Sequence, residues 1–164
     1  MPRWFAIRTS PRWELRASTE LFQRGFEIYV PLCHVKHKWS DRTKVVDVPL
    51  FPGYLFSRFL VRDRVRILQA AGVKQILGIG ERPAPISESE IANLRTLVDA
   101  RPVLVPWPYL RAGQRVRVDR GPLAGVQGFV VRVEEGSLRI VVSVDLLQRS
   151  VAAEIDRDCI GSVG

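Results

Sequence analysis

The sequence predicts an α+β region of about 100 residues followed by a small all-β region. In residues 1–100, apolar residues recur with strand spacing and helical spacing in alternation, which is typical of a sheet packed against helices. Residues 101–110 contain three prolines and favour a stiff, extended linker. Residues 111–164 contain short alternating apolar runs separated by glycine turns, a pattern typical of a small β-barrel. The predicted boundaries are therefore 1–100, 101–110 and 111–164.

The chain begins with a predicted strand, a helix and a second strand. Residues 4–8 are short, aromatic and apolar, as expected of a strand. Ser10 followed by Pro11 is a helix-start signal, because proline has no N–H to leave unpaired in the first turn. Gly25 is placed to end that helix, and residues 26–31 alternate as a strand that a proline closes.

A basic hairpin is predicted next. Residues 34–44 read HVKHKWSDRTK, and the Ser40-Asp41 pair lies between two segments of strand character. This pattern predicts a hairpin with its turn near Asp41. The hairpin would carry a ribbon of cations, which either binds an anionic partner or is simply solvated.

Large apolar side chains are most crowded between Val45 and Phe59, in the segment VVDVPLFPGYLFSRF. Its prolines cannot donate to a sheet, so a turn is expected around Pro52 and Gly53. After that turn, side chains alternate between two faces of a strand. One face holds Tyr54, Phe56 and Arg58, and the other holds Leu55, Ser57 and Phe59. Either both faces are buried or one is an apolar docking patch, and periodicity does not choose between these alternatives.

Three further elements complete the first region. Residues 62–71 predict a short helix that Gly72 ends, and residues 73–77 predict another strand. Ser87 and Glu90 form a capping box ahead of a helix over residues 88–99. The region therefore has a sheet of about four strands flanked by helices.

The charge of the chain points to an anionic partner. The formal net charge is +8 and the pI is about 10.3, and clustered Lys and Arg gain free energy by displacing counterions from phosphates. No apolar run approaches the ~20 residues that span a bilayer, and the N-terminus lacks the pattern of a secretory signal. We therefore expect a cytoplasmic monomer with no membrane partner.

Catalytic and metal-binding patterns are weak in this sequence. Cys33 and Cys159 lie far apart without CxxC spacing, which disfavours a disulfide framework. Cys33, His34 and His37 lack a fourth ligand at metal-site spacing. No pair of carboxylates is set apart for acid–base chemistry and no glycine-rich phosphate loop precedes a helix. The sequence therefore predicts a binding protein, not an enzyme, without metal or cofactor.

Four segments together resemble a known family. WFAIRTSPRWE, VPLFPGYLFSRF, PAPISESEI and RVRVDRGPLAGVQGFVVRV resemble, in that order, a NusG-type N-terminal (NGN) domain followed by an SH3-like KOW β-barrel. The form KWSDRTKVVDVPLFPGY looks more like the specialised RfaH and UpxY antiterminators than like the general elongation factor. The resemblance covers nearly the whole chain and implies a factor that suppresses pausing or termination by bacterial RNA polymerase.

The resemblance also implies a docking surface for the clamp helices of the polymerase β′ subunit. Tyr54 and Phe56 match the docking side chains, and Trp4, Phe51 and Pro52 match their frame. Arg62, Arg64 and Arg66 match the region that faces the β subunit across the cleft, although they depart from the threonine-rich motif of RfaH.

Cations of the first region match surfaces that contact non-template or upstream DNA in relatives. Arg12 and Arg16 are four residues apart, so we expect them on one face of the first helix, with Arg8 beside it. The hairpin would add further phosphate contacts. The candidate nucleic-acid residues are Arg8, Arg12, Arg16, Lys36, Lys38, Arg42 and Lys44.

The KOW region of the resemblance implies a second partner. Leu146, Leu147 and Arg149 match the loop that contacts the termination factor Rho or a small-subunit ribosomal protein. The general factor has phenylalanine-glycine where this chain has Leu147-Gln148, so we expect weakened contact with Rho and ribosome contact through Leu147. The turn and close-packing glycines are Gly121, Gly125 and Gly128.

The sequence leaves open the fold of the second region and the function class of the chain. RfaH stores this region as a helical hairpin, whereas the valine-rich tail here favours strands. An RNA- or ribosome-binding KOW module and a general NusG that couples to Rho are the alternatives to a specialised antiterminator.

Overall fold

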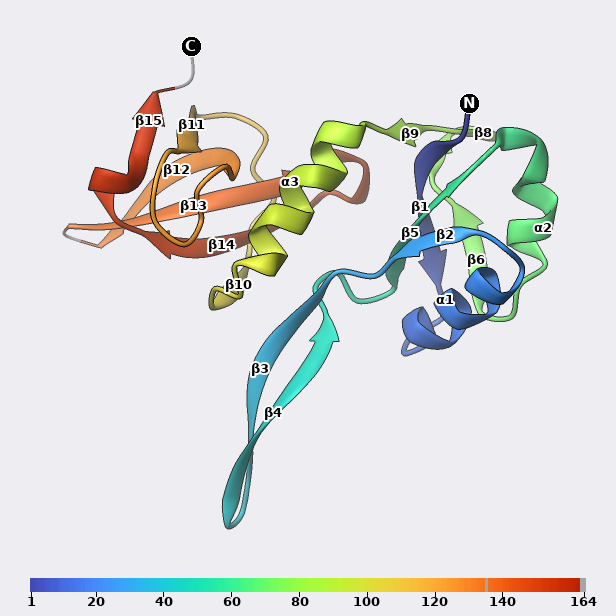
Figure 1. Ribbon diagram of the computed structural model, residues 1–164, viewed down its shortest axis with the longest axis horizontal. Coiled ribbons are helices and arrows are strands. Elements are labelled where there is room, and N and C mark those ends of the chain that lie inside the picture. Colours follow the sequence, from blue (N-terminus) through green and yellow to red (C-terminus); the bar gives the residue numbers. More distant parts are fainter. Residues whose placement is uncertain (135, 163–164) are drawn as a thin grey trace. The chain divides into compact units, whose positions relative to one another are not determined.

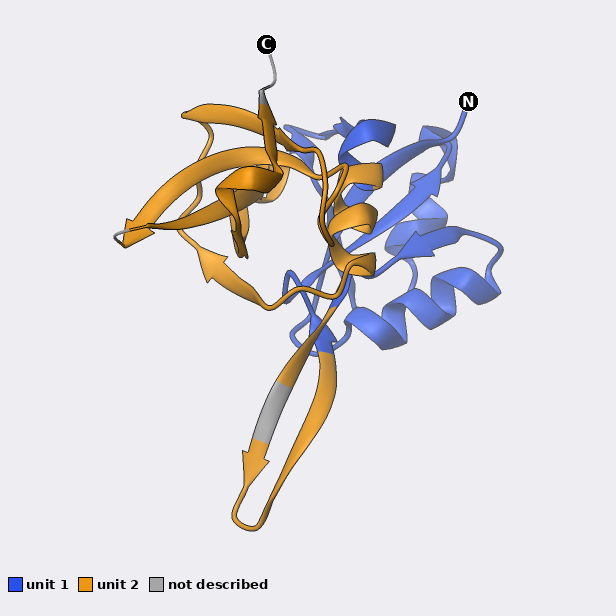
Figure 2. Cartoon of the chain, turned by 60° about the vertical axis from the view of Figure 1, so that its left-hand side comes forward, with its two compact units in different colours: residues 1–32, 48–91 blue, residues 33–47, 92–164 orange. Residues whose placement is uncertain are grey.

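The computed structural model describes residues 1–134 and 136–162, without the side chains of Lys36, His37 and Ser162. The chain divides into two compact units, coloured in Figure 2. Unit 1 comprises residues 1–32 and 48–91, and unit 2 comprises residues 33–47 and 92–164. Mixed helices and sheets confirm the predicted α+β class. None of the helices in the described part of the chain has the length and apolar character that a membrane crossing requires.

Unit 1 is built on an antiparallel sheet in the strand order β2-β5-β1-β6 (Figure 1). Strand β9 also pairs with β1, next to β6 along the same edge. The strands are β1 (Arg3–Thr9), β2 (Glu27–Tyr29), β5 (Tyr54–Phe59), β6 (Val73–Ile76) and β9 (Pro85–Ile86). The central pair β1–β5 places Ala6 opposite Phe56 and Arg8 opposite Tyr54. The predicted sheet of about four strands is confirmed.

Helices α1 (Glu14–Gln23) and α2 (Arg64–Leu68) pack on one face of this sheet, and a short 3₁₀ turn η1 (Val61–Asp63) precedes α2. The face alternates as predicted, because Leu55 and Phe59 of β5 point toward the helices. Two aromatic pairs lie within this core, with the Phe59 ring 4.6 Å from Phe5 and 6.3 Å from Phe26. The core residues are Phe5, Ile7, Ala17, Leu21, Phe26, Leu55, Phe59, Ile67 and Ala70.

Helix α1 starts later than the sequence predicts. Ser10 and Pro11 form a turn in which the Trp13 N–H donates to the Ser10 carbonyl at 3.1 Å, and the helix begins at Glu14. Arg12 has a φ of 67°, which no α-helical residue adopts. Arg12 therefore lies outside the helix, and the prediction that it shares a helical face with Arg16 is wrong.

The end of α1 follows the prediction. Gly25 has a φ of 92°, the left-handed conformation that glycine adopts without steric cost. The Gly25 N–H donates to Phe22 at 2.9 Å and the Phe26 N–H donates to Leu21 at 3.1 Å, which is the Schellman arrangement. The chain then turns directly into β2.

The basic hairpin and the capped helix are also confirmed. Strands β3 (Leu32–Trp39) and β4 (Arg42–Pro49) pair around a turn at Ser40 and Asp41. A smaller hairpin joins β7 (Gly78–Ile79) to β8 (Arg82–Pro83). Helix α3 spans Glu88–Asp99, and the Ser87 hydroxyl accepts the Glu90 N–H at 3.1 Å.

Unit 2 contains a six-stranded antiparallel sheet in the order β10-β14-β13-β12-β11-β15. The strands are β10 (Leu104–Trp107), β11 (Gln114–Val118), β12 (Gln127–Glu134), β13 (Ser137–Val144), β14 (Arg149–Ile155) and β15 (Ile160–Ser162). Two 3₁₀ turns, η2 (Asp145–Leu147) and η3 (Arg157–Cys159), join the later strands. Strand structure in this region agrees with the valine-rich pattern, which favoured strands over helix.

Residues 101–110, predicted as a stiff and extended linker, include an edge strand of the unit 2 sheet. Leu104–Trp107 pairs with β14, from Leu104 opposite Ala153 to Trp107 opposite Ser150. Pro106 is compatible with this strand because β10 lies at the sheet edge, where a missing N–H donor breaks no ladder. The Ser143 hydroxyl also donates to the Leu110 carbonyl, so both halves of the segment are held on the sheet.

Glycines adjust the backbone between β11 and β12. Gly121 and Gly125 have φ values of 87° and 95° in the connecting turn. Gly128 lies within β12, where an added Cβ would meet the Val141 carbonyl oxygen at 2.5 Å. The close approach of β12 and β13 therefore requires a residue without a side chain at position 128.

Gly128→Ala tests this requirement. We expect it to lower the free energy of unfolding by about 1–3 kcal/mol, the usual cost of overpacking, because the clash is with backbone. Urea unfolding followed by far-UV circular dichroism measures the change. Gly136→Ala is the control: no atom lies within 4 Å of its added Cβ, and its φ of 84° costs only about 1–2 kcal/mol. A smaller loss for Gly128→Ala than for Gly136→Ala would contradict the packing argument.

Candidate functional site

A tight turn at residues 51–54 carries the candidate docking residues. The Tyr54 N–H donates to the Phe51 carbonyl at 3.1 Å, and the Thr9 N–H donates to the Gly53 carbonyl at 2.8 Å. Gly53 has a φ of 87°, which the sequence anticipated. Pro52 is exposed and Tyr54 is partly exposed, whereas Phe51 is buried. The turn therefore presents a proline and one face of a tyrosine to solvent.

Glu14 holds this turn and was not recognised in the sequence. Glu14 is only 4% exposed, and its carboxylate accepts the Gly53 N–H at 3.2 Å. A hydrogen bond to a charged acceptor is worth about 1.5–3 kcal/mol, more than a neutral one. The two residues are 39 positions apart, so no local pattern could have paired them. The available signal was an acidic residue in the first turn of a helix, which usually has only a capping role.

Phe56 is not an outward docking residue. Its side chain is 0% exposed, and the Tyr29 ring stacks beside it with centroids 6.2 Å apart. Ala6 is its neighbour across β1. An aromatic ring buries about 150–250 Å² when it is sealed in this way, so it stabilises the sheet. The prediction of an exposed Tyr54–Phe56 pair is therefore wrong for Phe56.

Trp4 is likewise buried on this second face of the sheet. It is 2% exposed, and its indole N–H donates to the Glu88 carboxylate at 3.2 Å. Arg58 bonds the other oxygen of Glu88 at 2.9 Å and lies 4.0 Å from Glu27. Trp4, Phe51 and Phe56 are thus interior residues, and Pro52 and Tyr54 alone of the five predicted clamp residues reach solvent.

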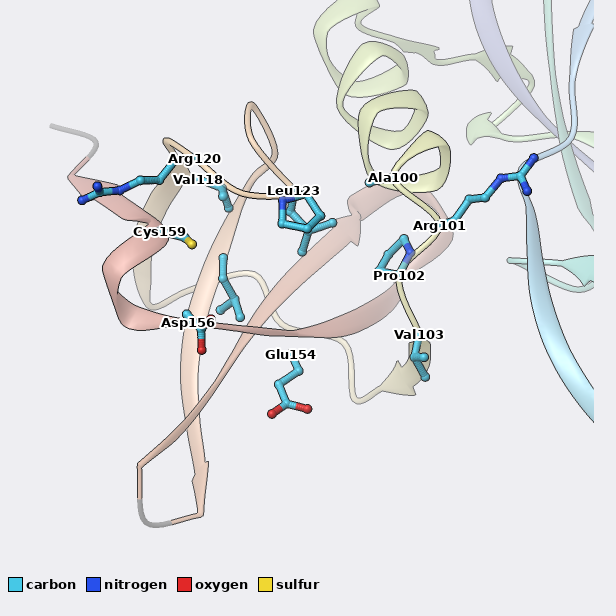
Figure 3. Close-up of a pocket in the computed structure, with 12 residues that line it drawn as sticks. Ala100, Arg101, Pro102, Val103, Val118, Arg120, Leu123, Glu154, Asp156 and Cys159 are labelled. Atoms are coloured by element: carbon cyan, nitrogen blue, oxygen red, sulfur yellow. The ribbon is translucent and has the colours of Figure 1, made fainter.

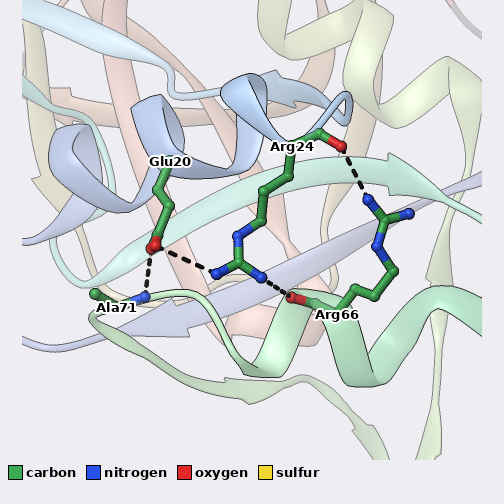
Figure 4. Close-up of polar contacts among 4 residues, drawn as sticks. All are labelled: Glu20, Arg24, Arg66 and Ala71. Carbon is green, nitrogen blue, oxygen red and sulfur yellow. Dashed lines mark hydrogen bonds and ion pairs between the residues drawn. The ribbon is translucent and has the colours of Figure 1, made fainter.

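The three arginines around α2 differ in their contacts. The Arg66 guanidinium donates to the Arg24 carbonyl at 3.1 Å, and Arg24 donates to the Arg66 carbonyl at 3.3 Å (Figure 4). Arg66 also lies 4.7 Å from the Phe26 ring and 3.9 Å from Asp63. Arg66 therefore ties α2 to α1, although its side chain remains half exposed.

The other two arginines, Arg62 and Arg64, are exposed and, within the described residues, do not tie α2 to α1 through a contact like that of Arg66. Arg62 is exposed, and Arg64 is exposed with one hydrogen bond to the Val61 carbonyl at 3.3 Å. The Glu20 carboxylate of α1 is 3.4 Å from Arg24 and also accepts the Ala71 N–H. A partner at this surface would therefore meet mainly Arg62 and Arg64.

The cations near the first helix do not form one helical patch. Arg8 is exposed on β1 and is the cross-strand neighbour of Tyr54. Arg16 lies over the Trp13 ring at 4.3 Å, and Arg12 lies in the preceding turn. The fold thus places Arg8 beside the docking turn.

The hairpin β3–β4 combines cations with an exposed aromatic residue. Trp39 is 42% exposed, and the Arg42 guanidinium lies 5.7 Å from its ring centroid. Lys38 and Lys44 are exposed, and the His34 imidazole contacts the Asp47 carboxylate near the base. Lys36, another predicted cation, lies outside the described side chains. Trp39 was not among the predicted site residues.

The η2 loop of unit 2 presents less apolar surface than predicted. Leu147 is 3% exposed and belongs to the interior, so its predicted role as a ribosome contact is wrong. Leu146 is partly exposed, while Gln148 and Arg149 are exposed. The Arg149 guanidinium donates to the Gln148 carbonyl at 3.2 Å, which keeps it on the loop.

Unit 2 also contains a cavity of about 480 Å³ between the segment after α3 and the sheet (Figure 3). Val118, Leu123 and Ile155 contribute apolar surface to it. Arg120 and Glu154 contribute opposite charges. The sequence did not single out any of these residues.

The cysteines and carboxylates show no catalytic arrangement in the part of the chain that is described. Cys33 and Cys159 are free thiols, and burial raises the pKa of Cys33, with the Asp47 carboxylate acting in the same direction. Among the described residues, no group of three or more His, Cys, Asp or Glu side chains is gathered as metal ligands.

Several known proteins are similar to this chain along most of its length. A NusG described as a transcription termination/antitermination protein from Deinococcus radiodurans is 29% identical over 93% of this chain and 95% of its own. The NusG of Escherichia coli K12, described in the same words, is 27% identical over 94% and 92%. A solved structure on domain interaction in Thermotoga maritima NusG covers 100% of this chain and 98% of its own with a TM-score of 0.59. At 17% identity, that structure supports the fold alone.

A family model described as transcription termination factor nusG matches residues 2–95. This match covers more than half of the chain and contains the docking turn and all of unit 1 except Met1. Proteins of this kind are transcription factors without enzymatic activity, so the interpretation as a binding protein is confirmed. The chain belongs to the NusG family of transcription termination and antitermination factors.

Proposed function

We propose that this NusG-family factor docks on RNA polymerase through the 51–54 turn and suppresses pausing or termination. The observation that carries the proposal is the partly exposed Tyr54 beside the exposed Pro52, on a turn held by Glu14. Aromatic residues in well-packed surroundings supply most of the affinity in protein interfaces. We assign the partner surface to an apolar helical part of the enzyme, the clamp helices of the β′ subunit.

The buried aromatic residues contribute to docking by positioning the turn. Phe51 at the start of the turn and Phe56 two residues after Tyr54 are 3% and 0% exposed, so buried side chains anchor the chain on both sides of Tyr54. A pre-organised surface loses less conformational entropy on binding than a flexible one. Arg8, across the sheet from Tyr54, adds a cation at the rim of the surface. Arg62 and Arg64 would form a second contact across the polymerase cleft.

The activity then follows from a shift in polymerase populations. A factor that binds the active clamp state more tightly than the paused state shifts the equilibrium toward the active state. About 2–3 kcal/mol of differential affinity changes the ratio of the two states by one to two orders of magnitude. No covalent step by the factor is needed.

The net charge supports a nucleic-acid contact beside the polymerase contact. Arg8, Arg12 and Arg16 would contact phosphates of non-template DNA, and the hairpin cations would contact upstream DNA. Residues 111–164 would act as a KOW module for a second partner, through Leu146 and the polar end of the η2 loop in place of the buried Leu147. We place this activity in the cytoplasm, with the chain acting as a specialised antiterminator.

A pull-down with core RNA polymerase tests docking. We expect Tyr54→Ala to lower the affinity about tenfold or more, the effect of removing an interface hot spot. Phe22→Ala is the matched control, because Phe22 is an aromatic residue 69% exposed on α1, outside the docking turn. Equal retention of the Tyr54 variant and the wild type would exclude the site, and no retention of the wild type would exclude the function.

Variants of Glu14 test how the turn is positioned. Glu14→Ala should speed hydrogen exchange of the Gly53 amide and lower the free energy of unfolding by about 1–3 kcal/mol, since the partly buried Gly53 N–H loses its acceptor. Glu14→Gln keeps an acceptor oxygen and should change both quantities less. NMR hydrogen exchange and urea unfolding are the measurements. An unchanged Gly53 exchange rate in Glu14→Ala would show that the turn is held without Glu14.

A further inference from the structure

The tip of the β3–β4 hairpin carries an exposed tryptophan among its cations, and a purely electrostatic role of the hairpin does not explain this side chain. A tryptophan is the largest apolar side chain, and Trp39 keeps 42% of its surface exposed next to the turn. The turn consists of Ser40 and Asp41, so Trp39 and Arg42 are the residues that flank it. Arg42 lies over the Trp39 ring at 5.7 Å. Exposing an indole in this way loses burial energy, and a ligand that stacks on the ring would recover it.

The strand period separates the hairpin cations into two sets. Arg42 and Lys44 are two residues apart on β4, so they share a face, and the contact of Arg42 with Trp39 places the ring on that face as well. Lys38 precedes Trp39 on β3 and therefore points to the opposite face. One face thus combines a ring with two cations, and the other has a lysine without the ring.

A ring between cations matches the chemistry of an unpaired nucleic-acid strand. Phosphates pair with Lys and Arg, and the planar faces of unpaired bases stack on aromatic side chains. In a duplex the bases stack on one another, so an indole gains little from them. The exposed Asp41 lies in the turn itself and would repel phosphates there, which directs the backbone toward Arg42 and Lys44.

We propose that this hairpin face binds a single-stranded segment of DNA or RNA, with Trp39 stacking on a base and Arg42 and Lys44 contacting the flanking phosphates. The proposal deepens the nucleic-acid part of the proposed function by naming the ligand as an unpaired strand. It does not depend on docking to RNA polymerase, which the Tyr54 pull-down tests separately.

Fluorescence anisotropy with labelled oligonucleotides of about 12 nucleotides tests the proposal on the full chain, a length typical of single-strand sites. The probes are single-stranded DNA, single-stranded RNA and a DNA duplex of the same sequence. We expect Trp39→Leu, which keeps an apolar side chain without a π face, to bind a single strand about tenfold more weakly. Trp39→Phe should retain most of the affinity. The duplex should respond less than twofold to either substitution.

The two single-stranded probes identify the source of the ligand. Loss of affinity in Trp39→Leu for the DNA strand, for the RNA strand or for both supports stacking on bases. Unchanged affinity for both strands overturns the proposal. Heparin, a polyanion without bases, is the second control: equal weakening of heparin and oligonucleotide binding in Trp39→Leu would also overturn it. Because Trp39 is exposed, we expect its variants to fold like the wild type, so a loss of affinity reports on binding. Far-UV circular dichroism of each variant checks that it is folded.

A matched pair of lysine variants tests the assignment of faces. Lys44→Gln and Lys38→Gln remove the same charge from opposite faces of the hairpin. We expect Lys44→Gln to reduce the slope of log affinity against log salt by about 0.7, the contribution of one phosphate contact to a single strand, and Lys38→Gln to leave the slope unchanged. Equal slopes for the two variants would contradict the assignment of faces. If Lys44→Gln weakens binding while Trp39→Leu does not, the strand preference fails and general phosphate binding remains.

Discussion

Burial of β5 on both faces is the constraint on which the rest of unit 1 depends. Leu55 and Phe59 pack against α1 and α2, while Phe56 on the other face lies beside Tyr29 and is fully buried. The strand lies in the centre of the sheet between β1 and β2, so its backbone groups are paired on both edges. A strand held in this way cannot offer its aromatic face to a partner without losing core contacts. The surface available for docking is therefore the turn that leads into β5.

The 51–54 turn is held in place by strand β5, which follows it, and by the Glu14 carboxylate, which is distant in the sequence. Glu14 accepts the Gly53 N–H, Thr9 donates to the Gly53 carbonyl, and Tyr54 continues directly into the ladder with β1. This arrangement presents a small surface of Pro52 and Tyr54 at little entropic cost on binding. The proposed division of labour has the turn recognise a protein helix and the β3–β4 hairpin recognise nucleic acid. Apolar contact then supplies affinity that salt affects little, and the cations supply affinity that salt weakens.

Much of the fold was predictable because its local signals agree with its tertiary structure. The capping box at Ser87, the Gly25 helix end, the Ser40-Asp41 turn and the alternation of β5 all correspond to observed elements. Predictions failed where a contact from far along the chain decided the outcome. The Ser10-Pro11 signal did not start a helix, because the Ser10 N–H donates to the distant Gly72 carbonyl at 2.8 Å and Arg12 takes a positive φ. Residues 104–107 of the predicted extended linker form an edge strand because they pair with β14.

The sequence by itself determined the α+β class, the succession of elements and the family, because hydrophobic period, turn residues and the LFPGYLF segment are local properties. Only the tertiary structure decided which aromatic residues reach solvent. Alternation places Tyr54 and Phe56 on the same face, but exposure depends on what packs beside each one, and Tyr29 and Ala6 belong to other strands. The same reason explains Leu147. Its position in a loop made it a candidate contact, but its side chain is buried in the interior of unit 2. The pairing of Glu14 with Gly53 likewise required the folded chain to bring them together.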